Sequence, residues 1–218
     1  MDKPLNRIDG VVYPTPAEAA LYSECGAWTR ETFGEALRNA AKMAPDRTAY
    51  VCDERKISFA ELDGVTDRLA VALRALGLQL HDRAMFQMGT SIETVVALFG
   101  CFKAGVIPVC SIPQFREIEI GTLAELTQPK GYFVQTGASG GFDLASFAAT
   151  MARRYSIPHV ITTAAVPANG QHSLEALCAG TSSASLLDTS GEFGCADVMA
   201  FQLSGGSTGV PKIIPLPR

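Results

Sequence analysis

Apolar residues recur along this chain with two different spacings. Between residues 58 and 77 they fall on one face of a helix, at Leu62, Val65, Leu69, Leu73 and Leu76, with intervals of three and four positions. Short, continuous apolar runs follow at 84–87 and 106–109, as expected of strands covered on both faces of a sheet. The alternation predicts an α/β fold: a mainly parallel sheet flanked by helices.

Capping signals give the helix boundaries. Thr32 with Glu35, and Ser58 with Glu61, each form the pattern of a capping box, and Gly105 is placed to end a helix. The predicted helices cover residues 17–23, 33–43, 59–76, 92–102, 117–126, 144–155 and 174–179. The predicted strands cover residues 48–52, 84–87, 106–109, 132–134 and 159–162, with a brief return strand at Ile57 after a turn over 53–56. Residues 180–197 are rich in Ser, Gly and Thr. We therefore expect them to form a loosely packed connecting segment, the loose crossing.

The first thirty residues differ from the rest. They carry three prolines and little periodicity, so we expect residues 1–30 to form an extended N-terminal arm packed on the body by Trp28. No low-complexity linker divides residues 31–218, which we therefore treat as one unit.

Composition narrows the possible functions. Charged residues make up 18% of the chain, below the usual ~25%. The net charge is −4 and no basic stripe with interleaved aromatics is present, which argues against nucleic acid as a partner. No run of 18 apolar residues occurs, and residues 1–10 lack an apolar core, so we expect no membrane span, no signal peptide and a cytoplasmic location.

Cysteine and histidine spacing predicts no metal site. The six cysteines include no CxxC pair, and His81, His159 and His172 stand far apart in the sequence. His81 lies in a polar segment, where we expect it to be solvated.

One glycine-rich run stands out near the end of the chain. Residues 203–212 read LSGGSTGVPK between two apolar segments. Glycines allow close approach, while hydroxyls, backbone N–H groups and a Lys can hold phosphate oxygens. The run is not a Walker A loop, because Lys212 follows Pro211 and Ile213 stands where Ser or Thr would hold Mg²⁺. On composition alone, a flexible surface hairpin is an equal alternative. A second glycine-rich segment, 136–141, has no Lys and is interpreted as a connection.

Three segments together resemble a known family. They are ISFAEL at 57–62, FKAGVIPV at 102–109 and QLSGGSTGVPK at 202–212. In order and spacing they are similar to the first three core motifs of the adenylate-forming acyl and aryl acid ligases, and the third is the specific one. The segment 22–28, the wording FQLSGG and the start Arg116-Glu117-Ile118 resemble the 2,3-dihydroxybenzoate–AMP ligase branch.

The resemblance implies a two-step chemistry. A carboxylic acid attacks the α-phosphate of ATP, in the presence of Mg²⁺, and the acyl adenylate then passes to the thiol of CoA or of a phosphopantetheine carrier protein. The family's glycine-rich loop closes over the ATP phosphates. Carried to this sequence, the implied ATP-binding residues are Ser204, Gly205, Gly206, Ser207, Thr208, Gly209 and Lys212.

The resemblance also implies what these residues lack. Family members are more than twice as long, and their acid pocket, adenine site, Mg²⁺-binding Glu and catalytic Lys follow the third motif. We therefore expect an N-terminal portion of the AMP-binding domain, truncated just after the phosphate loop, with no catalytic or metal-binding residue of its own and no adenylating activity alone.

Two alternatives remain open at this stage. Leu216-Pro217 and Gln114-Phe115 differ from the aryl-acid pattern, which leaves an aliphatic or alicyclic acyl-CoA synthetase as the alternative substrate class. A non-catalytic nucleotide-binding or scaffold domain is the alternative of another kind.

Overall fold

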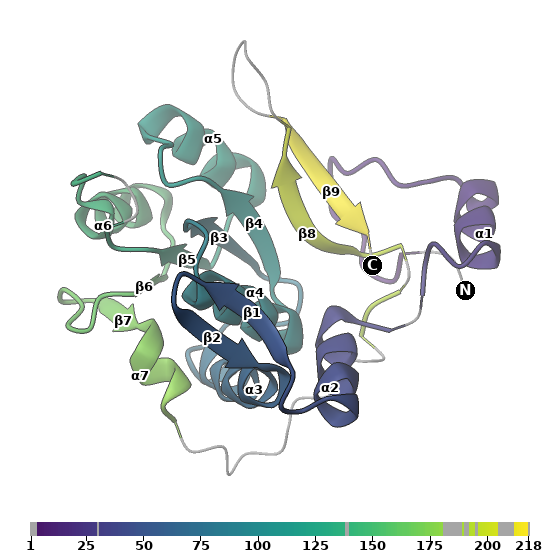
Figure 1. The fold of residues 1–218 in the computed structure, drawn as a ribbon. Coiled ribbons are helices and arrows are strands. Elements are labelled where there is room, and N and C mark those ends of the chain that lie inside the picture. Colours follow the sequence, from purple (N-terminus) through teal and green to yellow (C-terminus); the bar gives the residue numbers. More distant parts are fainter. Residues whose placement is uncertain are drawn as a thin grey trace.

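A seven-stranded sheet forms the centre of the molecule (Figure 1). The computed structural model describes residues 4–29, 31–137, 140–180, 189, 192–194, 196–204 and 212–217. The strand order is β7-β6-β5-β3-β4-β8-β9. Every neighbouring pair is parallel except β8 with β9, which is antiparallel. The predicted α/β fold with a mainly parallel sheet is confirmed.

The strands are short, as the apolar runs predict. The sheet contains β3 (Arg83–Gln87), β4 (Ile107–Ser111), β5 (Gly131–Val134), β6 (His159–Thr162), β7 (Gln171–Ser173), β8 (Val198–Leu203) and β9 (Ile213–Pro217). A separate antiparallel hairpin joins β1 (Thr48–Cys52) and β2 (Arg55–Ser58).

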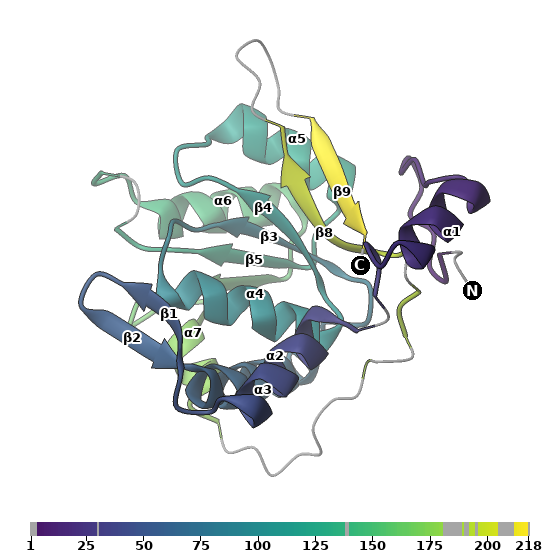
Figure 2. The same ribbon diagram turned by 45° about the vertical axis from the view of Figure 1, so that its right-hand side comes forward.

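Helices cover both faces of the sheet (Figure 2). One face carries α2 (Phe33–Met43), α3 (Phe59–Ala75), α4 (Ile92–Ala104), α7 (Leu174–Cys178) and the β1–β2 hairpin. The other carries α5 (Glu117–Thr127) and α6 (Leu144–Tyr155). Along β3 the side chains alternate, because Ala84 and Phe86 join the first core and Met85 joins the second. Both faces of this strand are thus buried, which explains its continuous apolar run.

The predicted caps are present. The Thr32 and Ser58 side chains accept from the N–H groups of Glu35 and Glu61, and each Glu side chain accepts from the capping residue's N–H. Gly105 ends α4 in the left-handed conformation, with φ 71°. Local sequence therefore decides where these helices begin and end.

Several local predictions need correction. The β1–β2 turn uses only Asp53 and Glu54, because β2 already begins at Arg55. β7 is absent from the predicted strands, since its three residues lack an apolar pattern. The end of the predicted loose crossing is packed rather than loose: Phe193 is 4% and Asp197 is 1% exposed.

His81 is not the solvated residue that its polar surroundings suggest. Its ring packs edge-on against Phe193, with the centroids 4.6 Å apart. Burial lowers the pKa of His81, although Asp197 and Glu192 act in the opposite direction. The tertiary position of Phe193, more than a hundred residues away, decides this environment.

The backbone of β9 presents two different edges. Ser204 N–H donates to Lys212 O over 2.9 Å, so the N–H of Lys212 and of every second residue after it points towards β8. The N–H positions of Ile213, Pro215 and Pro217 therefore point outward, and two of them are prolines. Within the described part of β9, this edge therefore offers few backbone donors.

The N-terminal arm lies along the β8–β9 side of the molecule (Figure 1). It contains α1 (Pro16–Glu24), whose capping residue is Thr15. Ile8, Val11 and Tyr13 pack against the α5–α6 core, while Trp28 contacts Tyr22 within the arm, at 5.2 Å between ring centroids. Ile8, Val11 and Tyr13 therefore hold part of the arm on this core, and anchoring by Trp28 stays a prediction.

Candidate functional site at the carboxyl edge of the sheet

The parallel strands end together at one edge of the sheet. β3 continues into α4 on one face, whereas β4 and β5 continue into α5 and α6 on the other. In open α/β sheets, ligands bind outside the carboxyl ends of the strands, where successive connections leave towards opposite faces. β8 ends at this same edge, and the glycine-rich run follows it directly.

The two ends of the glycine-rich run are held together. Ser204 N–H donates to Lys212 O over 2.9 Å, and Lys212 N–H donates to Ser204 Oγ over 3.1 Å. The loop is thus closed at its base by the last pair of the β8–β9 ladder. Gly205, Gly206, Ser207, Thr208 and Gly209 lie outside the described residues, so their roles stay predictions.

Lys212 also borders a concavity of about 1020 Å³. Its walls come from the arm, the end of α5, the start of β3 and the β8–β9 hairpin, including Asn6, Thr127, Arg83 and Pro215. Because β3 begins and α5 ends there, most of this concavity lies towards the amino edge of the sheet, and among the described residues only Lys212 links it to the base of the loop. Lys212 and Ser204 bring one ammonium group and one hydroxyl to the two ends of the loop, and both are donors suited to phosphate oxygens.

A buried carboxylate anchors the other end of β8. Asp197 Oδ1 accepts from Asn6 N–H over 2.9 Å, and Oδ2 accepts from Gly194 N–H over 2.7 Å. One residue thereby fixes the arm and the segment preceding β8 to each other. The strand that carries the glycine-rich run therefore starts from a fixed point.

A buried polar network supports the loops at the carboxyl edge. Tyr132 Oη donates to Gln87 Oε1 over 2.5 Å, and Gln87 Nε2 donates to Phe115 O over 2.8 Å. Burial raises the pKa of Tyr132, so it remains a neutral donor. The network ties the end of β3 and the interior of β5 to the β4–α5 loop. Sequence reasoning missed it; the available signal was a Gln inside an apolar strand.

Two further contacts hold neighbouring loops. The Arg116 guanidinium carbon lies 3.9 Å from the centre of the Phe142 ring, a cation–π distance. Gly89 N–H donates to Gln135 Oε1 over 2.9 Å, which links the β3–α4 and β5–α6 loops. The 136–141 segment, interpreted as a connection, begins here, and Thr136 N–H donates to Thr163 Oγ1.

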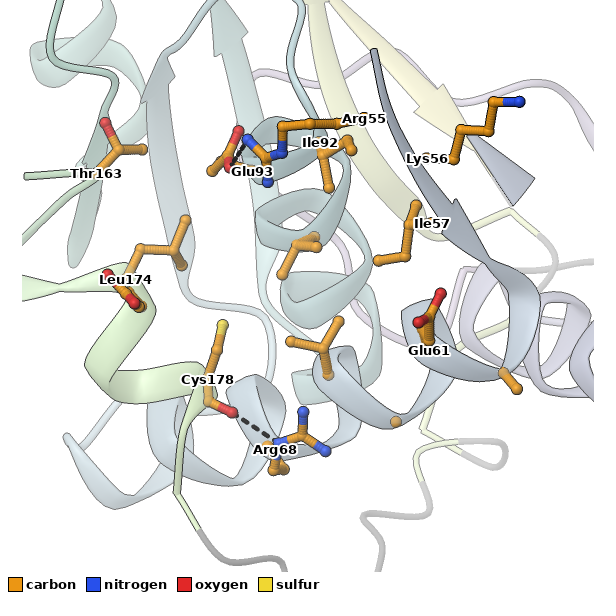
Figure 3. A pocket seen from close by; sticks show the side chains of 15 residues that line it. Arg55, Lys56, Ile57, Glu61, Arg68, Ile92, Glu93, Thr163, Leu174 and Cys178 are labelled. Atoms are coloured by element: carbon orange, nitrogen blue, oxygen red, sulfur yellow. Dashed lines mark hydrogen bonds and ion pairs between the residues drawn. The ribbon is translucent and has the colours of Figure 1, made fainter. Parts of the chain in front are cut away.

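A second concavity, of about 840 Å³, lies on the α3–α4 face (Figure 3). Arg55 and Glu93 pair across its upper rim at 2.7 Å, and Arg68 Nε donates to Cys178 O at its base over 2.6 Å. Glu61 is engaged by the cap of α3. These polar groups therefore serve the packing of the β1–β2 hairpin, α3 and α7.

Comparison with known proteins identifies the family. The model of the AMP-binding enzyme family matches residues 37–217. The chain belongs to the AMP-binding enzyme family. The resemblance seen in the three sequence motifs is thereby confirmed.

Among its relatives are two aryl acid ligases. The chain is 35% identical over 204 residues to the 2,3-dihydroxybenzoate-AMP ligase of Bacillus subtilis, covering 93% of this chain and 36% of that protein. It is 34% identical over 213 residues to the salicyl-AMP ligase / salicyl-S-ArCP synthetase of Mycobacterium tuberculosis, covering 94% and 37%. This member of the AMP-binding enzyme family thus spans little more than a third of the length of these relatives.

Solved structures agree on the fold. The apo structure of Mycobacterium smegmatis MbtA matches with a TM-score of 0.81 and 27% identity, over 94% of this chain and 37% of that one. The anthranilate CoA ligase AuaEII in complex with anthranoyl-AMP matches with a TM-score of 0.74 at 18% identity, over 87% and 35%; this second match shows the fold alone.

Neither a metal cluster nor a membrane helix occurs in the part of the chain that the structure describes. These residues contain no group of three or more His, Cys, Asp or Glu side chains arranged to hold a metal ion. Among them, no helix is long and apolar enough to cross a membrane.

Proposed function

We propose that this chain is the N-terminal, phosphate-binding portion of an acid–AMP ligase. The protein to which it contributes would activate a carboxylic acid with ATP as an acyl adenylate and pass it to the thiol of CoA or of a carrier protein. The observation that carries the proposal is the closed base of the glycine-rich run, with Ser204 and Lys212 joined at the carboxyl edge of the sheet.

An aryl acid is the substrate class best supported. The two relatives described above have names that specify 2,3-dihydroxybenzoate and salicyl substrates. Both match more than nine-tenths of this chain. The resemblance implies that the acid pocket lies in the portion of the relatives that this chain does not match, so the support comes from overall similarity rather than from a pocket in this chain.

The physical role of the loop follows from the charge that develops during adenylation. Attack on the α-phosphate releases pyrophosphate, whose growing negative charge requires donors already in position. Ser204 and Lys212 stand at the base from which Gly205, Gly206, Ser207, Thr208 and Gly209 would add backbone and hydroxyl donors. Mg²⁺ would be held by a carboxylate outside this chain.

Activity is expected only when the rest of the domain is supplied. The 218-residue chain alone should give no ATP–pyrophosphate exchange with 2,3-dihydroxybenzoate, salicylate or octanoate. A chimera in which it replaces the matching third of the Bacillus subtilis ligase should exchange pyrophosphate with the aryl acids. Exchange by the chain alone, or a folded chimera that is inactive with aryl acids, would contradict the proposal.

Phosphate binding by the glycine-rich run is tested with inorganic triphosphate. Titration into the chain should shift the backbone NMR signals of Ser204 and Lys212, weakly but with saturation. Lys212→Gln should weaken this binding about tenfold or more, since a charge-assisted hydrogen bond contributes roughly 1.5–3 kcal/mol. Lys56→Gln, which removes an exposed Lys of the β1–β2 hairpin, is the matched control. If both substitutions weaken triphosphate binding equally, the binding depends only on the net charge of the chain, which would contradict a specific phosphate site at Lys212.

A further inference from the structure

Two histidines that are separate in the sequence meet on the surface of the sheet. β6 and β7 are parallel neighbours at one end of the sheet, and the register pairs Ile161 with His172. His159 therefore lies on the same face as His172, two residues before Ile161, the register partner of His172. Their ring centroids are 5.7 Å apart, with the ring planes inclined by 46°.

The position beside His159 on the β7 side leaves room for a ligand. On one side His159 is in register with Gly131 of β5, and on the other the β6–β7 register leads back to Gly170. The side of Gly131 is filled, because a Cβ there would lie 3.3 Å from Ala84 Cβ and from Leu78 Cδ2. The side of Gly170 is open, because nothing lies within 4 Å of the point where a side chain of Gly170 would begin. Both imidazoles are half-buried, so water reaches them from outside.

Two neighbouring imidazole rings are chemically suited to a transition metal, because each neutral ring offers a nitrogen lone pair. Neutral imidazole suits Zn²⁺, Cu²⁺ and Ni²⁺.

We propose that His159 and His172 together bind one divalent transition-metal ion, represented here by Zn²⁺. Water molecules supply the remaining ligands. With a zinc–nitrogen distance of about 2 Å, two rings that share an ion have centres roughly 5–6 Å apart. The observed separation of 5.7 Å falls in that range. The site has two protein ligands and is therefore open and exchangeable, unlike a closed structural zinc site.

Binding would have a mechanical consequence. β7 is the edge strand of the sheet and has only three residues, followed at once by α7. An ion shared by His159 and His172 would tie this edge to β6. The site is far along the strand order from β8 and the glycine-rich run, so the proposal is independent of the ligase function.

The chain contains three histidines, and the third serves as the internal control. Metal-free protein is titrated with Zn²⁺ near neutral pH, and the imidazole NMR signals are followed. The signals of His159 and His172 should move together and saturate at one equivalent, while those of His81 should not move. Because the readout is specific to histidine, Zn²⁺ bound by cysteines does not interfere; Cys25→Ser removes the exposed thiol.

Substitutions make the test decisive. His172→Gln should abolish the response of His159 and weaken binding at least tenfold, whereas His81→Gln should leave both unchanged. Zn²⁺ should raise the Tm of the parent protein and of His81→Gln, but not that of His172→Gln. The proposal is overturned if His159 and His172 respond at different Zn²⁺ concentrations, or if His159 still responds in His172→Gln.

Discussion

Replacement of Lys103 by Ala is expected to lower the free energy of unfolding by about 3–5 kcal/mol. Lys103 lies on α4, and its side chain is only 3% exposed. Its Nζ donates to Asp63 Oδ1 over 2.5 Å, to Asp67 Oδ1 over 2.8 Å and to Asp63 O over 2.8 Å. The substitution would leave two carboxylates of α3 facing an empty space, and a buried charge without its partner is costly.

The expected loss comes from the carboxylates that remain, not from the net strength of the ion pair. The Asp63 and Asp67 side chains are 19% and 12% exposed, and Arg38 still contacts Asp67 at 2.6 Å. Asp63 therefore loses the only cation that pairs with it among the described residues. In Lys103→Met with Asp63→Asn, that unpaired charge is also removed. We expect this double variant to lose clearly less stability than the sum of the two single changes.

Denaturant unfolding of the purified chain measures these differences. The matched control is Arg55→Ala, which breaks the Arg55–Glu93 pair, 2.7 Å long, with side chains 66% and 31% exposed. Exposed pairs contribute about 0–1 kcal/mol, so this change should cost less than about 1 kcal/mol. Similar losses for Lys103→Ala and Arg55→Ala would show that burial does not decide the contribution at α3–α4.

Sequence predicted the features that depend on neighbours in the chain. The Ser58–Glu61 cap, the end of α4 at Gly105 and the apolar run of β3 each follow from residues within about one turn or one strand. The structure confirms all three. For the candidate site, the local pattern of glycines and hydroxyls left a phosphate loop and a surface hairpin as equal alternatives. Only the resemblance to the ligase motifs assigned ATP binding to Ser204 and Lys212, and that role stays a prediction.

Features that depend on distant residues escaped prediction. Lys103 reads as an ordinary polar position of a helix, and only the packing of α4 on α3 brings it to Asp63, 40 positions earlier. Gln87 and Tyr132 are 45 positions apart and meet because β3 and β5 are neighbours. His159 and His172 meet through the pairing of β6 with β7, a strand that has no apolar pattern. Strand order, which sequence periodicity does not encode, decides each of these contacts.

Gly105→Ala is expected to cost about 2–5 kcal/mol, the sum of two effects at one position. Gly105 ends α4 with φ 71° and ψ 22°, and a residue with a Cβ in the left-handed region loses roughly 1–2 kcal/mol. A Cβ would also lie 2.3 Å from Leu80 Cδ2 and 3.4 Å from Phe193 Cε2. Such overpacking typically costs about 1–3 kcal/mol.

Gly170→Ala separates the two effects. Gly170 has a similar φ of 82°, but nothing lies within 4 Å of the position that a Cβ would take, so only the backbone cost of roughly 1–2 kcal/mol should appear. The difference between the two variants in denaturant unfolding then measures the contact with Leu80 and Phe193. If the two variants lose the same stability, Leu80 moves aside at no cost, and the packing around Gly105 and Phe193 is loose. If that difference is present, the same glycine that ends α4 also fixes Phe193, close to Asp197 and the start of the strand that carries the glycine-rich run.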